Sequence, residues 1–135
     1  MTKRRQAREY CLQGLYLADA GMTGEEISSA FERILVGLDP ETANFARRLF
    51  SGSLSSLEKI DSAISAKATN WKLSRMPAVD RNILRLAAYE LFVEPETPVA
   101  AVIDEAIELA KKYSTDDSPA FVNGILDQLK SLRQT

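Results

Sequence analysis

The 135-residue sequence contains no histidine and a single cysteine, Cys11. Without histidine, the chain lacks Ser–His and Cys–His catalytic pairs, a histidine general base and metal sites built on imidazole. Its six glycines are scattered, and neither GxGxxG nor GxxxxGK[ST] occurs, so the sequence has no recognisable phosphate-binding loop. The lone cysteine excludes an internal disulfide and fits a reducing compartment. We therefore expect no enzymatic activity, no cofactor and no bound metal ion.

Long apolar runs are also missing, and none approaches the ~18 residues of a membrane-spanning helix. The basic start lacks the continuous apolar stretch and the small-residue cleavage site of a secretory signal. Hydrophobic residues make up 45% and charged residues 27% of the chain, which are ordinary values for a globular domain. The sequence therefore predicts a single cytoplasmic domain over residues 1–135, without a membrane segment.

Apolar residues spaced by three and four dominate the sequence, and no stretch alternates convincingly like a strand. The expected fold class is all-α. Helix-start and helix-stop signals predict six main helices, at about 3–20, 24–36, 40–64, 79–91, 99–113 and 118–132. We expect them to form two three-helix halves, about 1–69 and 70–135, with the boundary near 70–76.

Positive charge is concentrated at the start, where Lys3, Arg4, Arg5 and Arg8 occur without an acidic neighbour. Positions 9–135 carry 13 basic against 19 acidic residues. Cations at a helix N-terminus oppose the helix dipole, so this cluster reduces helix stability. One interpretation is a solvated terminus that aids solubility, and the other is a surface that neutralises phosphates, for which guanidinium groups are well suited. The charge placement favours the second interpretation.

A second candidate segment near the other end reads STDDSPAFVNG. Ser118 is typical of a helix start, and Asp117 is favourable near the helix dipole, so a structural explanation suffices for both. The start of a helix also offers free backbone N–H groups to a phosphate. Phe121, if exposed, provides a ring on which an unpaired base can stack. Tyr16 on the first helix is either a core residue or a similar ring.

Three blocks in order, KRRQAREYCLQGLY, VDRNILRLAAYEL and EAIELAKKYSTDDSPAFVNGILD, resemble the NusB family of bacterial transcription antitermination factors. The similarity spans nearly the whole chain, from Arg4 to Asp127. It implies an all-helical fold that binds boxA RNA together with NusE, a small-subunit ribosomal protein, and joins other Nus factors on RNA polymerase. A related domain precedes the catalytic domain of some RNA methyltransferases, but here that alternative would require a truncated gene.

The resemblance implies RNA contacts near both ends of the chain, which are expected to meet on one surface. The implied RNA-binding residues are Lys3, Arg4, Arg5, Arg8, Tyr16, Asp117, Ser118, Phe121 and Asn123. NusE is expected to bind around the helix at 79–91, with Asp80, Arg81 and Arg85 as exposed contacts. Some family members form homodimers that cover the RNA surface. A helical adaptor that binds only proteins is the competing hypothesis, and it predicts no preference between boxA and scrambled RNA.

Overall fold

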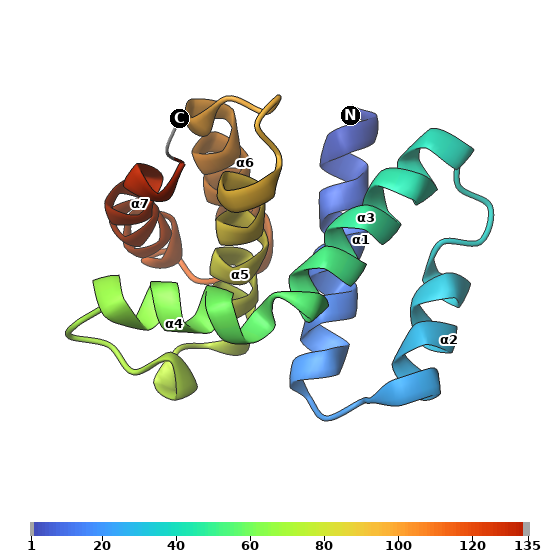
Figure 1. Ribbon diagram of the computed structural model, residues 1–135, viewed down its shortest axis with the longest axis horizontal. Helices are drawn as coiled ribbons and strands as arrows, with labels where there is room; N and C mark the ends of the chain where they lie inside the picture. The colour runs from blue at the N-terminus through green and yellow to red at the C-terminus, as the bar shows by residue number, and fades with distance from the viewer. Residues whose placement is uncertain (1, 134–135) are drawn as a thin grey trace.

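The computed structural model describes residues 2–133, which form seven α-helices and two short 3-10 helices (Figure 1). The α-helices are α1 (Lys3–Asp19), α2 (Gly24–Ile34), α3 (Pro40–Ser55), α4 (Leu57–Lys67), α5 (Ala78–Val93), α6 (Val99–Tyr113) and α7 (Ser118–Leu129). The 3-10 helices are η1 (Leu73–Arg75) and η2 (Lys130–Leu132). Since no strand occurs in this described part of the chain, the all-α prediction is confirmed. No helix within it is long and apolar enough to cross a membrane.

The expectation of one long helix from residue 40 to 64 is wrong, because the helix is interrupted at Ser56. The backbone N–H of Ser56 donates to the carbonyl of Gly52 in α3, while its own carbonyl accepts from Ile60 in α4. Four serines and one glycine occupy positions 51–56. Serine and glycine are weak helix formers, so this stretch tolerates the break. The described chain therefore has seven α-helices instead of the expected six.

Helix α5 lies at the centre of the molecule, where it contacts α1, α3, α4, α6 and α7. Figure 1 shows α1, α2 and α3 on one side of it and most of α4 and α7 on the other, while α6 overlaps it in this view. Helix α4 packs against α5 and α7. We therefore propose that the two helical halves divide at Ser56, and not near residue 69.

Close packing of α1 on its neighbours depends on Gly14. The rings of Phe31 and Phe50 stack with centroids 4.0 Å apart beside this glycine. A Cβ atom at position 14 would lie only 2.6 Å from Cδ1 of Phe31. The missing side chain thus allows α1 to approach α2 and α3, which fixes the position of the basic start of α1.

Candidate nucleic-acid interface

The N-terminal cations occupy the first turn of α1. This helix begins because the hydroxyl of Thr2 accepts a hydrogen bond from the backbone N–H of Arg5 at 3.0 Å. Lys3 Nζ lies 3.3 Å from Asp39 and 3.1 Å from Glu41 at the start of α3. Exposed ion pairs of this kind contribute little to stability, so a phosphate can replace the carboxylates at small cost.

Arg5 and Arg4 present their guanidinium groups on either side of this turn. Arg5 Nε lies 3.0 Å from Oε2 of Glu105 in α6. Arg4 forms no ion pair with a carboxylate in the part of the chain that the structure describes, and its guanidinium carbon lies 4.3 Å from the centroid of the Phe45 ring. Arg48 lies over the same ring at 4.9 Å. These side chains form an exposed basic surface around the start of α1 and α3.

Arg8 belongs to the same sequence cluster but occupies a different environment. Its side chain is only 6% exposed, and its Nε and Nη2 atoms donate to the Glu90 carboxylate at 2.7 and 2.8 Å. Burial disfavours the charged guanidinium, but the hydrogen bonds and charge of Glu90 outweigh it and raise the pKa of Arg8. Because the guanidinium is enclosed between α1 and α5, Arg8 ties these helices together, and the expectation that it contacts RNA is not supported.

Asp80 was expected to be exposed, and this expectation is wrong. The residue is 4% exposed. Its carboxylate accepts hydrogen bonds from the hydroxyls of Ser114 and Ser118, at 2.5 and 2.9 Å. Ser118, which the sequence assigned to RNA binding, is also buried. The carboxylate thus joins the start of α5 to the end of α6 and the start of α7, and a partner cannot reach either side chain from solvent.

Arg85 was expected to be exposed as well, but it too is buried. Its guanidinium donates to both carboxylate oxygens of Asp61 in α4, at 2.8 and 2.9 Å, and to Oδ1 of Asp19 in α1, at 3.1 Å. Arg81 is largely covered and donates to Asp19 and to the carbonyls of Leu73 and Met76. Both arginines therefore hold α1, α4 and η1 onto the start of α5.

Asp19 is the shared acceptor of this network. Partial burial alone would raise the pKa of its carboxyl, but hydrogen bonds from Arg81, Arg85 and Asn82 and the charge of Arg85 outweigh this effect and lower the pKa. Sequence reasoning missed Asp19. The signal was weak, since a lone aspartate at the end of a helix has no distinctive partner within several residues of it.

The aromatic candidates are more accessible. Tyr16 is 46% exposed, and Asp117 and Asn123 are exposed. Phe121 is partly buried, and its ring meets that of Trp71 edge to face, with centroids 5.3 Å apart and an interplanar angle of 78°. Tyr16 and Phe121 thus both keep some ring surface in contact with solvent.

The structure brings the residues expected to contact RNA together only in part. Tyr16 precedes Asp19 by one turn, and the pairs Asp19–Arg81 and Asp80–Ser118 place the end of α1 and the start of α7 on either side of the start of α5. Lys3 lies 13 residues before Tyr16, about 20 Å away along the helix axis. The N-terminal cations are therefore separated from the Asp117–Asn123 segment by roughly the length of α1, and the structure does not bring the two expected groups of RNA contacts into one compact cluster.

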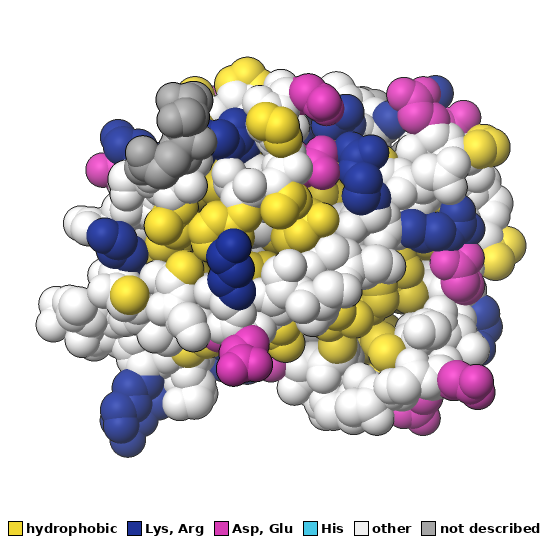
Figure 2. Space-filling view, viewed as in Figure 1, with side chains coloured by type: hydrophobic (Ala, Val, Ile, Leu, Met, Phe, Trp, Pro, Cys, Tyr) yellow, Lys and Arg dark blue, Asp and Glu magenta, His cyan; other side chains and the backbone are white. Residues whose placement is uncertain are grey.

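Sequence reasoning also missed the segment from Lys67 to Arg75, which contains Trp71. The signal was present, because this stretch, KATNWKLSR, holds three cations and no acidic residue. Figure 2 shows basic and acidic side chains interspersed over much of the visible face, whereas a basic group at its lower left, where Figure 1 places the α4–α5 connection, stands apart from acidic ones. In residues 2–133, no group of three or more cysteine, aspartate or glutamate side chains is arranged to hold a metal ion.

Comparison with known proteins assigns the chain to a family. The model of the NusB family matches residues 5–131. The chain belongs to the NusB family. It is 52% identical to the transcription antitermination protein NusB of Elusimicrobium minutum, over 99% of this chain and 97% of that protein. Its identity to the protein of the same name from Geotalea daltonii is 44%, over 97% of this chain and 96% of the relative.

Solved structures agree with this assignment. T. maritima NusB superposes with a TM-score of 0.89 and 40% sequence identity, over 96% of this chain and 91% of that one. A crystal structure of antitermination factors NusB and NusE in complex with dsRNA contains a chain that matches with a TM-score of 0.85 and 26% identity, over 96% of this chain and 97% of its own length. The family resemblance of the three sequence blocks is thus confirmed.

Proposed function

We propose that this protein is a transcription antitermination factor that binds boxA RNA together with NusE and acts with other Nus factors on RNA polymerase in the cytoplasm. The observation that carries the proposal is the near-full-length similarity to proteins named transcription antitermination protein NusB. The related structure of NusB and NusE with RNA supports both partners.

The phosphate contacts of this proposal fall on Lys3, Arg4 and Arg5. All three are exposed, and the pair of Lys3 with Glu41 is a weak surface pair, whereas Glu105, which accepts from two nitrogens of Arg5, is only 19% exposed. An RNA phosphate would exchange with Glu41 or Glu105 and release counterions from the strand. Because the rest of the chain is acidic, the affinity of this surface for arbitrary RNA is limited.

Sequence preference then comes from the other end of the molecule. Unpaired bases are the part of RNA in which sequence can be read, through stacking on aromatic rings and hydrogen bonds to base edges. Tyr16 and Phe121 offer the rings, and the exposed amide of Asn123 offers hydrogen bonds. Asp117 repels phosphates, so it favours strands whose backbone runs away from the start of α7.

A titration with boxA RNA and a scrambled RNA of equal length, each with and without NusE, tests the proposal. We expect preferential binding of boxA, formation of a one-to-one complex with NusE, and tighter boxA binding by this complex than by the protein alone. Equal affinity for the two RNAs would support the protein-binding adaptor instead. Sedimentation of the free protein, with and without boxA, tests whether a homodimer covers the surface.

A further inference from the structure

Most basic side chains in residues 2–133 form an ion pair with a carboxylate, but none of the three between the last residue of α4 and the end of η1 does. Lys67, Lys72 and Arg75 are exposed, and none of them lies within ion-pair distance of an acidic side chain in the described chain. These three cations lie within nine residues of one another in the sequence, and no carboxylate of the described chain forms an ion pair with any of them. In a chain with a net charge of −2, such a group is suited to an anionic ligand.

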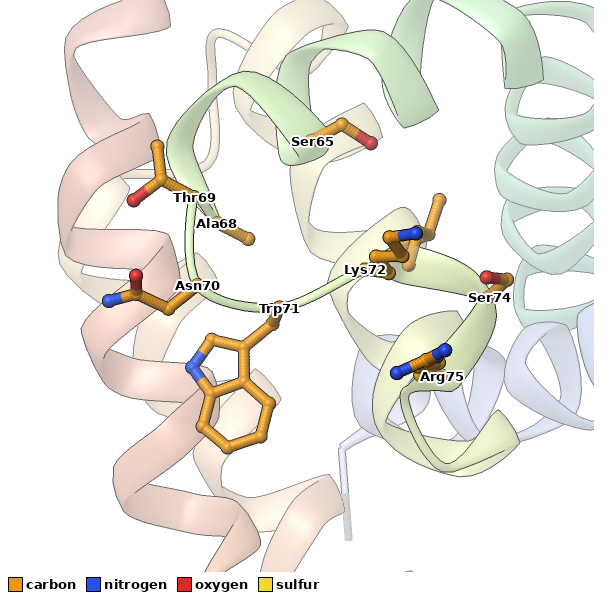
Figure 3. Close-up of a pocket in the computed structure, with 9 residues that line it drawn as sticks. Ser65, Ala68, Thr69, Asn70, Trp71, Lys72, Ser74 and Arg75 are labelled. Atoms are coloured by element: carbon orange, nitrogen blue, oxygen red, sulfur yellow. The ribbon is translucent and has the colours of Figure 1, made fainter.

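Trp71 lies between these cations in the sequence and is 58% exposed. Tryptophan side chains are on average highly buried, so an indole with this exposure is unusual. The ring is nevertheless held in place, by its edge-to-face contact with Phe121 in α7 and by the hydrogen bond from the Trp71 backbone N–H to the carbonyl of Ala68 at 3.0 Å. Figure 3 shows the indole projecting from the connection, with Lys72 and Arg75 following along the same segment.

Two grooves adjoin at Trp71. One is lined by the connection itself, and the other lies between the connection and α7, where Phe121 and Gln128 line it. Neither lining contains an acidic residue. The side chains of Thr69, Asn70 and Gln128 supply hydrogen-bond donors and acceptors beside the rings.

We propose that these two grooves form an RNA subsite in which Trp71, beside Phe121, stacks on one unpaired base while Lys67, Lys72 and Arg75 neutralise the adjacent phosphates. Aromatic rings combined with a cationic groove are the usual means of binding single-stranded nucleic acid. The subsite rests on the proposed function and extends it, since Phe121 is shared with the surface that already includes Asp117, the residue just before α7.

The chemistry favours RNA over a protein partner. An acidic protein surface would satisfy the cations but would not use the mixture of one exposed ring with amide and hydroxyl groups. A nucleotide can use the cations, the ring and the polar groups together, because it carries a phosphate, a planar base and polar base edges. Continuity with Phe121 also allows one strand to run from α7 across the connection.

Trp71 is the only tryptophan, so its fluorescence reports on this subsite alone. The protein is titrated with a single-stranded boxA oligonucleotide, and binding is followed in parallel by the anisotropy of a fluorescent label on the RNA. We expect the Trp71 emission to be quenched along the same binding curve as the anisotropy, both with the protein alone and with the NusE complex.

Four variants, two at Trp71 and two triple replacements of cations, extend the test. Trp71→Ala should weaken boxA binding about 5- to 150-fold, and Trp71→Phe should recover much of it. Replacing Lys67, Lys72 and Arg75 with glutamine should flatten the dependence of log K on log salt by about 2. A matched triple, in which Arg33, Lys59 and Lys130 become glutamine, changes the net charge equally and should leave the slope nearly unchanged.

Thermal melts establish that each variant is folded. RNA binding with unchanged Trp71 emission, together with a cation triple that behaves like its matched control, would overturn the subsite while leaving the proposed function intact. Emission that changes only when NusE is added, in the absence of RNA, would assign the grooves to a protein partner. If the wild-type protein and its NusE complex bind neither RNA, the proposed function fails and the subsite fails with it.

Discussion

The carboxylate of Glu90 accepts two hydrogen bonds from the guanidinium of Arg8, 82 positions earlier in the sequence, and both side chains are buried. The pair joins α1 to α5, the helix that contacts most of the others. Arg8 was grouped with its basic neighbours in the sequence, but this contact separates it from them. The difference between Arg8 and Arg4, only one turn apart, leads to the first prediction.

Replacing Arg8 with methionine should lower the free energy of unfolding by about 3–5 kcal/mol, because it leaves the carboxylate of Glu90 buried without a partner. Arg4→Met is the matched control and should change it by less than about 0.5 kcal/mol, since Arg4 is exposed. Urea denaturation measures both. The double variant Arg8→Met/Glu90→Leu should recover most of the loss. Equal effects of the two single substitutions would contradict a structural role for Arg8.

A second prediction concerns the exposed cations. Replacing Lys3, Arg4 and Arg5 with glutamine should lower the affinity for boxA and scrambled RNA alike. It should also reduce the slope of log K against log salt by about 2, at roughly 0.7 per phosphate for a single strand. Fluorescence anisotropy between low and moderate salt measures the slope. If it does not change, these residues are a solubilising end of the helix and contact no phosphate.

Tyr16 provides a test of base readout. Because its ring is 46% exposed, Tyr16→Ala should hardly affect the thermal melt. It should weaken boxA binding by about 1–3 kcal/mol, the contribution of one stacked base, and should weaken the binding of scrambled RNA less. Tyr16→Phe keeps the ring and is the control, so it should bind nearly as well as the wild type. A Tyr16→Ala protein that melts several degrees lower would instead identify the ring as part of the core.

Helix ends were predictable because their signals are local. Asp39 accepts a hydrogen bond from the backbone N–H of Thr42, and Pro40 follows it in the first turn, as expected for a helix start. Gly37 has a φ of 86°, which few other residues adopt, and it ends the preceding helical stretch as expected. The break at Ser56 was missed because apolar spacing continues across it, although the serines and the glycine of positions 51–56 are weak helix formers.

The burial of charged residues was not predictable, because their partners are distant in the sequence. Arg85 pairs with Asp61 and with Asp19, which lies 66 positions away, and no pattern within one helix indicates either contact. The same holds for Asp80 and Ser118. Sequence alone recognised the family, but it could not separate exposed charges from those used to join helices.

Because Arg85 is buried, its replacement should lower stability and leave partner binding unchanged, whereas an exposed partner contact would behave the other way round. Arg85→Met should lower the free energy of unfolding by about 3–5 kcal/mol, since Asp61 and Asp19 both lose a charged donor. Binding of NusE by the fraction that stays folded should be unchanged. Lys111→Met is an exposed control and should alter neither quantity. Calorimetry gives the stability and titration below the melting range gives the affinity. A normal melt with lost NusE binding would restore Arg85 as a contact.

The last prediction concerns pH. The pKa of Asp19 is lower in the folded protein than its ordinary value of 3.8, chiefly because hydrogen bonds from Arg81 and Arg85 outweigh the effect of burial. As pH falls below that value, the unfolded chain takes up a proton that the folded protein still excludes, so the stabilisation present at higher pH is progressively lost. Asp19→Asn cannot titrate, and it lacks this stabilisation at every pH.

The free energy of unfolding of the wild type should therefore exceed that of Asp19→Asn at neutral pH, and the gap should narrow as the pH falls from about 5 to about 3. Urea denaturation at several pH values measures both curves. Glu96→Gln is the control, since it removes an exposed carboxylate that forms no ion pair in residues 2–133. Its free energy of unfolding should change with pH in parallel with that of the wild type. A gap between wild type and Asp19→Asn that stays constant over this range would mean that Asp19 titrates normally in the fold. The arginine network would then hold α1 on α5 by geometry without stabilising the charge of its central carboxylate.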